Sequence, residues 1–268
     1  MKYKMLVTDL DGTLLNDSGN ISSKTIEEII KIHNRKILFS IASGRPLTMQ
    51  EFQNWNLGFE PELRIGLNGG ECFDYLENKT YHYYQLSKET INEIVKMMNE
   101  INLHHNFFVH GNGNIITNKY DSTFEHQSYS SVKRIIVTNN DEKVCCKENC
   151  VILFRFESKE LADKAMKIVK QYQNDKYKVF KSSDKLVEFV DTRLSKTLAL
   201  KEFCKRHNLL LEEVIACGDS DNDMELLKDV GLGICMVNGS VNTKNCAQVI
   251  SKADNNHDGM IDEVLKFL

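Results

Sequence analysis

The sequence predicts an α/β fold, with a Rossmann-like parallel sheet as the core and an inserted α+β cap domain. Two short apolar runs that read as buried strands, 5–7 and 214–217, each end in a cluster of carboxylates, and open parallel sheets bind their ligands at such strand ends. The chain between residues 43 and 196 is also far longer than the helix and strand of one βαβ unit require. We therefore expect a core built from 1–82 and 189–268, with a cap at 83–188 of about modal domain size.

The first strand runs into DLDGTL, residues 9–14. At the strand period of two, Asp9 and Asp11 point the same way and can reach one shared point. Adjacent carboxylates repel, and hard oxygen ligands without a supporting His or Cys favour Mg²⁺ over zinc or copper. An Asp-Gly pair alone is common in turns. A second acidic cluster, GDSDND at 218–223, favours a functional site at two neighbouring strand ends.

The next elements offer groups that can hold a phosphate. A helix fits between the first two strands, with Ile26, Ile29 and Ile30 on one face. The second strand, 37–42, ends in Ser-Gly-Arg-Pro at 43–46. Pro46 suits the first turn of a helix. This arrangement predicts that the Ser43 hydroxyl and the Gly44 N–H lie at a helix N-terminus, which binds anions.

A further helix is predicted from Lys196 to His207, because apolar residues recur at helical spacing and Ser195 can cap it. Lys196 then lies in the first turn, where the helix dipole disfavours a cation. It is either an ordinary surface lysine or one held by a nearby anion. A lone lysine is normally exposed. Only the presence of the other motifs supports the interpretation that an anion holds Lys196.

The inserted segment has a mixed pattern. Apolar residues at helical spacing predict helices at 88–98 and 161–172, and Gly111-Asn112-Gly113 indicates a hairpin turn. The runs that read as strands are 106–109, 114–117, 151–156, 178–180 and 186–190. An α+β cap follows from this alternation.

Taken in order, the motifs resemble those of the haloacid dehalogenase superfamily of phosphohydrolases, and within it the Cof-type branch. The resemblance rests on DLDGTLL at 9–15, ASGRP at 42–46, NGG at 68–70, Lys196, GDSDND at 218–223 and the tail GLGICMVNG at 231–239. The chain departs from the pattern at Ser43, where Thr is common, and at Thr197 and Ser220, where Gly is usual. None of these changes removes a reactive group.

The resemblance implies a Mg²⁺-dependent phosphatase with a HAD-like fold that acts on small phosphate monoesters, such as sugar phosphates or phosphorylated cofactors. Asp9 would be the nucleophile and Asp11 the general acid and base. The metal ligands would be the Asp9 carboxylate, the Asp11 backbone carbonyl and Asp219. The remaining assignments are phosphate binding by Leu10, Ser43, Gly44, Lys196 and Asn222, contacts on the substrate side by Arg45 and Asn68, and orientation of Lys196 or a metal-bound water by Asp223.

Composition narrows the remaining functions. The chain has 268 residues, 41% of them hydrophobic, and a net charge of −4, which argues against a nucleic-acid partner. With no apolar stretch long enough to span a membrane and no signal peptide, we expect a cytoplasmic protein, monomeric or a small homo-oligomer. The eight cysteines lack metal-ligand spacing and are expected to be reduced. An EF-hand-like run at 254–259 has Leu265 where the bidentate Glu belongs, so calcium is not expected there.

Two alternatives stay open at this point. A phosphoacceptor or binding protein would use the same Asp and Mg²⁺ site without turnover, although it needs neither a general acid nor a cap. A phosphotransferase would pass the phosphoryl group to an acceptor other than water.

Overall fold

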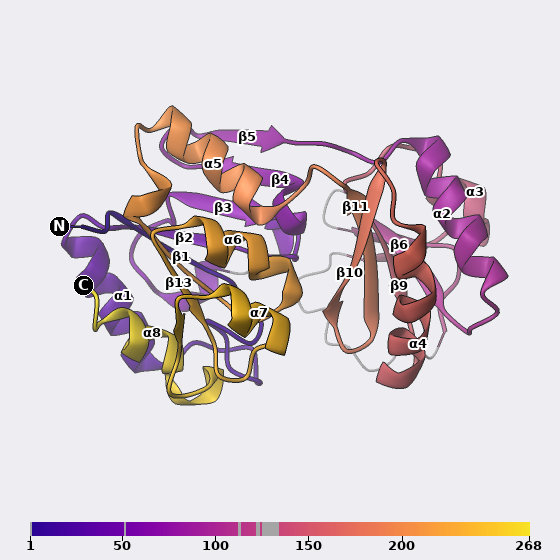
Figure 1. Cartoon of the computed structure of the whole chain (residues 1–268). Coiled ribbons are helices and arrows are strands. Elements are labelled where there is room, and N and C mark those ends of the chain that lie inside the picture. The colour runs from indigo at the N-terminus through magenta and orange to yellow at the C-terminus, as the bar shows by residue number, and fades with distance from the viewer. Residues whose placement is uncertain (1, 51, 112–113, 122–123, 125–133) are drawn as a thin grey trace. The chain divides into compact units, whose positions relative to one another are not determined.

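The computed structural model describes residues 2–50, 52–111, 114–121, 124 and 134–268 (Figure 1). The chain forms two compact units, one made of Met1–His82 with Ser195–Leu268 and the other of Tyr83–Leu194. The sequence predicted that the inserted unit ends at residue 188, but in the structure it ends at Leu194. The reason is that strand β11 (Leu186–Asp191) pairs on both sides within the smaller sheet.

The core unit is built on one eight-stranded sheet. Its strands lie in the order β14 (Val249–Ile250), β13 (Leu232–Cys235), β12 (Val214–Gly218), β1 (Met5–Thr8), β2 (Leu38–Ala42), β3 (Leu63–Gly66), β4 (Glu71–Asp74) and β5 (Lys79–His82). The pairs from β14 to β3 are parallel, so the predicted parallel sheet is confirmed. Strands β4 and β5 add an antiparallel edge, which the sequence reading did not include.

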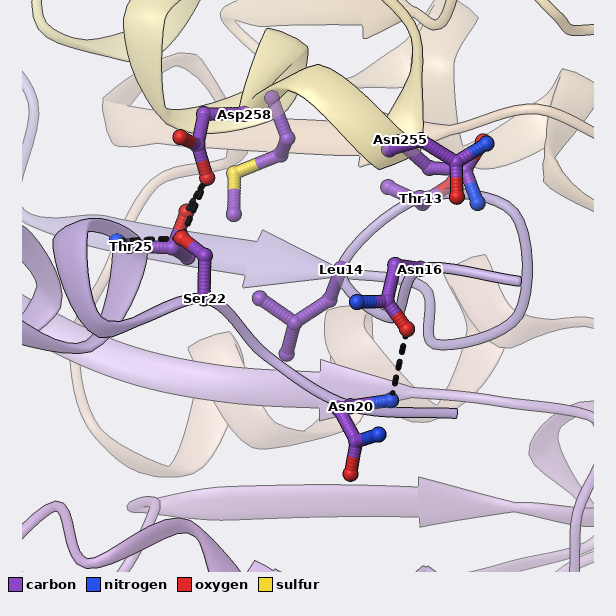
Figure 2. A pocket seen from close by; sticks show the side chains of 10 residues that line it. Thr13, Leu14, Asn16, Asn20, Ser22, Thr25, Asn255 and Asp258 are labelled. Atoms are coloured by element: carbon purple, nitrogen blue, oxygen red, sulfur yellow. Dashed lines mark hydrogen bonds between the residues drawn. The ribbon is translucent and has the colours of Figure 1, made fainter. Parts of the chain in front are cut away.

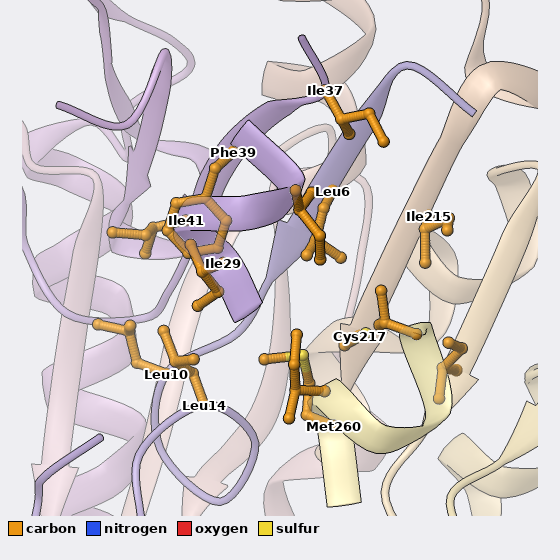
Figure 3. Packing of buried hydrophobic residues seen from close by; sticks show 14 of the residues in the cluster. Leu6, Leu10, Leu14, Ile29, Ile37, Phe39, Ile41, Ile215, Cys217 and Met260 are labelled. Atoms are coloured by element: carbon orange, nitrogen blue, oxygen red, sulfur yellow. The ribbon is translucent and has the colours of Figure 1, made fainter. Parts of the chain in front are cut away.

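Helices of the core unit pack against this sheet. They are α1 (Ser23–Asn34), α5 (Lys196–Arg206), α6 (Met224–Asp229), α7 (Val241–Cys246) and α8 (Gly259–Val264). Figure 3 shows Ile29 of α1 and Met260 of α8 packed on Leu6, Phe39 and Cys217 of the central strands. Burial of such large apolar side chains is the main stabilising term of the unit. Among the described residues, no helix has both the length and the apolar character needed to cross a bilayer.

The predicted helix after Pro46 is wrong. Pro46 is extended, with φ −61° and ψ 154°, and only a short 3₁₀ turn follows at η1 (Leu47–Met49), then another at η2 (Phe52–Trp55). Tertiary hydrogen bonds hold this segment in place of a helix. The Leu47 N–H donates to the Glu71 carboxylate at 2.7 Å, and the buried Gln50 amide donates to the Ile65 carbonyl at 2.8 Å. Ser43 and Gly44 therefore do not lie at an α-helix N-terminus.

The second unit is an α+β domain. Its sheet has the order β10 (Tyr177–Ser183), β11, β9 (Val151–Arg155), β6 (Asn106–Gly111), β7 (Asn114–Thr117) and β8 (Ile135–Val137). The helices are α2 (Lys88–Glu100), α3 (Asp141–Val144) and α4 (Lys159–Val169). The apolar faces of α2 and α4 share one buried cluster with Phe107, Phe154 and Phe189. Strands β6 and β7 pair as an antiparallel hairpin, whereas the predicted turn residues 112–113 lie outside the described residues.

The backbone of Gly69 lies so close to the backbone of Ser195 that there is no room for a side chain at this position. Its φ is +103°, and a Cβ built on it would lie 2.1 Å from the Ser195 carbonyl oxygen at the start of α5. We expect Gly69→Ala to lower the free energy of unfolding by more than about 2 kcal/mol, because strain of about 1 kcal/mol adds to a backbone clash. Urea unfolding would measure this loss. Gly58→Ala is the matched control, since Gly58 has φ +76° with nothing within 4 Å; equal losses in the two variants would contradict the prediction.

Candidate active site

The carboxylates of the two sequence clusters meet at the ends of two adjacent strands. Strands β1 and β12 pair in parallel with Thr8 opposite Cys217. The Asp9 N–H extends this ladder by donating to the Cys217 carbonyl at 2.9 Å. Asp9, Asp219 and Asp223 then present oxygen atoms that all lie within 4.8 Å of one another. The structure therefore brings together residues more than 200 positions apart in sequence.

Lys196 lies at the centre of this group. It is 1% exposed, and its Nζ donates to Asp9 Oδ1 and to Asp223 Oδ1, each at 2.6 Å. Ser195 caps helix α5 by accepting the Leu198 N–H, so Lys196 occupies the first helical turn as predicted. Lys196 is therefore not a surface lysine but one held by nearby anions. The two carboxylates offset the unfavourable effect of the positive end of the helix dipole.

Burial and charge shift the pKa values of both partners. Burial raises the pKa of Asp9 well above its ordinary value; the Lys196 ammonium opposes this rise, whereas the carboxylates of Asp223 and Asp219 add to it. For Lys196, burial would lower the pKa, but Asp223 and Asp9 outweigh it and the pKa lies above its ordinary value. The Lys196 ammonium thus opposes the effect of burial on the Asp9 carboxylate.

Asp219 is fixed by the loops around it. Its Oδ1 accepts the Thr13 hydroxyl at 2.8 Å, and its Oδ2 accepts the Ser220 hydroxyl at 3.0 Å. Burial and then the neighbouring Asp223 raise its pKa to about 6, although the two hydroxyls and Lys196 act against this. A cation at this position would relieve the repulsion that raises the pKa.

Asp223 is fully buried, and one of its carboxylate oxygens accepts hydrogen bonds from the backbone. Its Oδ2 accepts the N–H groups of Asp219 and Ser220, both at 3.1 Å, while Oδ1 accepts from Lys196. Gly218 leaves room for it, since a Cβ on that residue would come within 2.5 Å of the Asp223 Cγ. Asp223 therefore orients Lys196 and shapes the loop that carries Asp219.

Other predicted site residues are the phosphate-binding Ser43, Gly44 and Asn222 and the substrate-side Asn68. The Asn222 amide donates to Asn68 Oδ1 at 2.8 Å, and a Cβ on Gly44 would contact that same oxygen at 3.3 Å. Ser43 is 2% exposed, and its Oγ accepts the Arg45 N–H at 3.1 Å. Asn222, Asn68 and Gly44 thus form one cluster, with Ser43 next to it in the chain.

The side chain of Asp11 takes a different partner from Asp9. Arg45 Nε donates to Asp11 Oδ2 at 2.8 Å, and Arg45 Nη2 donates to Oδ1 at 2.5 Å. The Leu10 carbonyl accepts the N–H groups of Thr13 and Leu15, which closes the turn that carries Asp11. Asp11 is therefore presented by a tight turn and held by Arg45. The sequence assigned Arg45 to the substrate side, and that assignment stays a prediction.

The donor set fits a hard divalent cation. The oxygen atoms come from carboxylates, and in the described residues of this cluster no His or Cys is among the candidate ligands. Asp223 accepts hydrogen bonds from three donors, Lys196 and two backbone N–H groups, whereas Asp219 accepts from two hydroxyls and Asp9 from Lys196, so Asp9 and Asp219 are the candidate metal ligands. Burial first, and then the neighbouring carboxylates, raise the pKa of both groups, and a bound cation would favour their ionised forms.

Sequence reasoning missed two supporting side chains, Thr13 and Ser220, which both donate to Asp219. Each belongs to a motif that the sequence analysis recognised. A hydroxyl next to a cluster of carboxylates could have indicated that these side chains hydrogen-bond to Asp219. Ser220 occupies one of the positions where Gly is usual in the family pattern. Its hydroxyl therefore adds a contact that Gly lacks.

A polar pocket adjoins the loop that follows Asp11. Figure 2 shows Thr13, Asn16, Ser22, Asn255 and Asp258 around it. Asp258 accepts the Ser22 and Thr25 hydroxyls, and the Asn255 amide donates to the Leu15 carbonyl at 3.0 Å. The segment that resembled half an EF-hand is thus held by hydrogen bonds to the loop that follows Asp11 and to the start of α1.

Comparison with known proteins identifies the family and agrees with the fold. A family model described as haloacid dehalogenase-like hydrolase matches residues 6–264. This chain belongs to the haloacid dehalogenase-like hydrolases. Similar proteins include a 5-amino-6-(5-phospho-D-ribitylamino)uracil phosphatase of Bacillus subtilis, which is 26% identical over 96% of this chain and 92% of its own. A phosphoglycolate phosphatase of Methanopyrus kandleri is 24% identical over 94% of this chain and 91% of its own.

Solved structures of haloacid dehalogenase-like hydrolases share the fold. One from Bacteroides thetaiotaomicron superposes with a TM-score of 0.82 at 25% identity and covers all of both chains. The predicted superfamily, its Cof-type branch and the α/β fold are therefore confirmed. The enzymatic class is confirmed as well: the chain is a haloacid dehalogenase-type hydrolase, and the two relatives above, which match nearly its full length, are named as phosphatases.

Proposed function

We propose that this protein is a Mg²⁺-dependent phosphatase that hydrolyses small phosphate monoesters through an aspartyl-phosphate on Asp9. The observation that carries this proposal is the buried Asp9 carboxylate, paired through Oδ1 with Lys196 and close to Asp219. The pairing fixes the carboxylate at the end of β1. We assign Oδ2 as the atom that attacks phosphorus, because Oδ1 is already bonded to Lys196.

The surrounding residues supply the other parts of phosphoryl transfer. Lys196 and the Asn222 amide would hold equatorial phosphoryl oxygens, together with the Ser43 hydroxyl and the backbone N–H groups of Leu10 and Gly44. Asp11 would protonate the leaving oxygen and then take a proton from the attacking water. Asp223 would keep Lys196 aimed at the site through the 2.6 Å contact.

Asp9 and Asp219 would hold Mg²⁺, with the Asp11 backbone carbonyl as a further ligand. When bound, the cation supplies positive charge that offsets repulsion between a carboxylate nucleophile and a phosphate dianion. The raised pKa values of Asp9 and Asp219 indicate why these residues cannot both stay ionised at low cost without it.

Small phosphorylated metabolites are the proposed substrates, specifically sugar or polyol phosphates and phosphorylated cofactors. Support comes from the two relatives named above, one named for a phosphoribityl compound and one for phosphoglycolate. The negative net charge of the chain gives no reason to expect a nucleic-acid substrate.

Phosphate release across a panel of such esters tests the proposal, with MgCl₂ and then with excess chelator. We expect turnover of some esters, its loss on chelation and its return when Mg²⁺ is added back. Accumulation of a stable phosphoprotein without turnover would favour the phosphoacceptor alternative, and transfer to an added alcohol in preference to water would favour a phosphotransferase. Equal turnover with and without Mg²⁺ would refute the assigned metal.

Mg²⁺ should stabilise the folded protein more at pH 7 than at pH 5. The pKa of Asp219 is about 6 in the folded protein against an ordinary 3.8, so its contribution to stability is fully present below about pH 4 and is lost as the pH rises through 6. Asp9 shifts in the same direction, and Asp223 and Lys196 face both groups. A cation that binds the ionised carboxylates recovers this loss.

Thermal unfolding midpoints with and without millimolar MgCl₂ measure this effect. Asp219→Asn should remove most of the difference between the two pH values. Asp229→Asn, which changes a partly exposed aspartate paired with Lys201, should leave the difference as in the unmodified protein. A Mg²⁺ effect of the same size at both pH values would count against the proposed ligands.

A further inference from the structure

Arg45 makes a two-point contact with Asp11. Its Nε and Nη2 donate to the two carboxylate oxygens at 2.8 and 2.5 Å. The Arg45 and Asp11 side chains are 33% and 58% exposed, so the Coulomb energy of the pair contributes little to stability. The value of a side-on pair of this kind is geometric, because a planar guanidinium fixes the plane of the carboxylate.

The guanidinium is itself placed by contacts along the chain. The Arg45 N–H donates to Ser43 Oγ at 3.1 Å, and the Arg45 carbonyl accepts the Leu67 N–H at 3.2 Å. Nη1 points to the Met49 carbonyl at 3.5 Å. Both the backbone and the side chain of Arg45 are therefore anchored on segments of the core unit that flank strands β2 and β3.

We propose that Arg45 is a positioning residue that orients Asp11 for proton transfer. This inference rests on the proposed phosphatase function. A carboxylate has about four lone-pair positions, and Arg45 takes two of them. The remaining positions keep a fixed direction. A carboxylate held in one plane loses less entropy in reaching the transition state than a side chain on a freely rotating turn.

The chemistry that depends on this orientation has two steps. In the first, an Asp9 oxygen bonds to phosphorus while the bond from phosphorus to the leaving oxygen breaks, and the Asp11 carboxyl proton moves to that oxygen. In the second, a water oxygen bonds to phosphorus, Asp11 takes back a proton from that water, and the bond from Asp9 to phosphorus breaks. Arg45 touches neither phosphorus nor the leaving group in either step.

A role through Asp11 predicts dependence on the leaving group. An alkoxide needs a proton to depart, whereas p-nitrophenolate departs readily without one. We expect Arg45→Lys to lower kcat/KM by about 10²-fold or more for an alkyl phosphate that the unmodified enzyme hydrolyses, since general acid catalysis contributes about that much. For p-nitrophenyl phosphate the loss should be below about tenfold. The ratio kcat/KM is used because it reports the steps up to transfer onto Asp9.

Two further variants complete the test. Asp11→Asn should show the same preference between the two esters, and Arg45→Lys added to it should cause little further loss, because both act through one proton transfer. Arg206→Lys is the matched control, since Arg206 donates from Nε and Nη2 to Asp74, which this structure does not place among the catalytic residues. It should leave the ratio between the two esters unchanged.

Other results overturn the inference. Equal losses of kcat/KM for both esters would mean that Arg45 contacts the phosphoryl group, and no loss for either would mean a surface pair only. An increase for the alkyl ester would mean that Arg45 withholds Asp11 from the reaction. If the unmodified enzyme hydrolyses no ester with Mg²⁺ present, the proposed function itself fails and the role of Arg45 fails with it.

Discussion

Asp9→Asn is expected to abolish phosphate release, with a loss on the order of 10⁴-fold or more, because loss of a nucleophile removes the covalent step entirely. The amide keeps the size of the side chain but is a poor nucleophile, and its charge no longer attracts a cation. Phosphate release with the best ester of the panel measures the loss. Mass spectrometry of the acid-quenched protein should also show no phosphoryl adduct in the variant.

The control for Asp9→Asn is a carboxylate outside the site. Asp17→Asn changes an aspartate whose oxygen accepts the Asn255 amide, and activity should stay within a few-fold of the unmodified enzyme. Both variants should unfold in one cooperative transition. If Asp9→Asn retained a tenth of the activity or more, Asp9 would not be the nucleophile.

Lys196→Met is expected to have the largest effect on stability. The change leaves Asp9 and Asp223 buried without their cation, and breaking a buried pair by removing one partner costs about 3–5 kcal/mol. Activity should be lost as well, since Lys196 is assigned to the phosphoryl oxygens. Urea unfolding measures the cost. Because the variant has an excess of buried negative charge, Mg²⁺ should restore more of its stability than it adds to the unmodified protein.

Lys201→Met is the matched control for Lys196→Met. Lys201 lies on the same helix and pairs with Asp229 at 2.7 Å, but its side chain is 45% exposed. An exposed pair contributes at most about 1 kcal/mol. Similar losses in the two variants would show that position on α5, and not the buried charge cluster, determines the cost.

The site was more predictable than the segments around it. Asp9 and Asp219 each follow a short apolar strand, and parallel pairing of adjacent strands brings their ends together. The burial of Lys196 was not predictable in this way, because the local sequence favoured an exposed lysine. The anions that bury it come from two other segments, which no local pattern reveals.

Other features depended on tertiary contacts and could not be predicted locally. Pro46 suggested a helix, but Glu71 and the side chain of Gln50 bind the groups that decide the path of that segment. Strands β3, β4 and β5 are each only four residues long, which gives too few alternating positions for a periodicity argument. The pairing of Asp11 with Arg45 likewise joins two side chains that are distant in sequence and meet only in the folded chain.

The central strand β1 pairs with β2 on one edge and with β12 on the other. During synthesis β2 follows soon after β1, whereas β12 begins at Val214, after the whole of the second unit. At roughly 5–20 residues per second, a ribosome needs roughly 10–40 s to reach it. We therefore expect the nascent polypeptide to carry one open hydrogen-bonding edge throughout that interval, when a chaperone could cover it. The carboxylates of Asp219 and Asp223 can join Asp9 only after β12 has been synthesised.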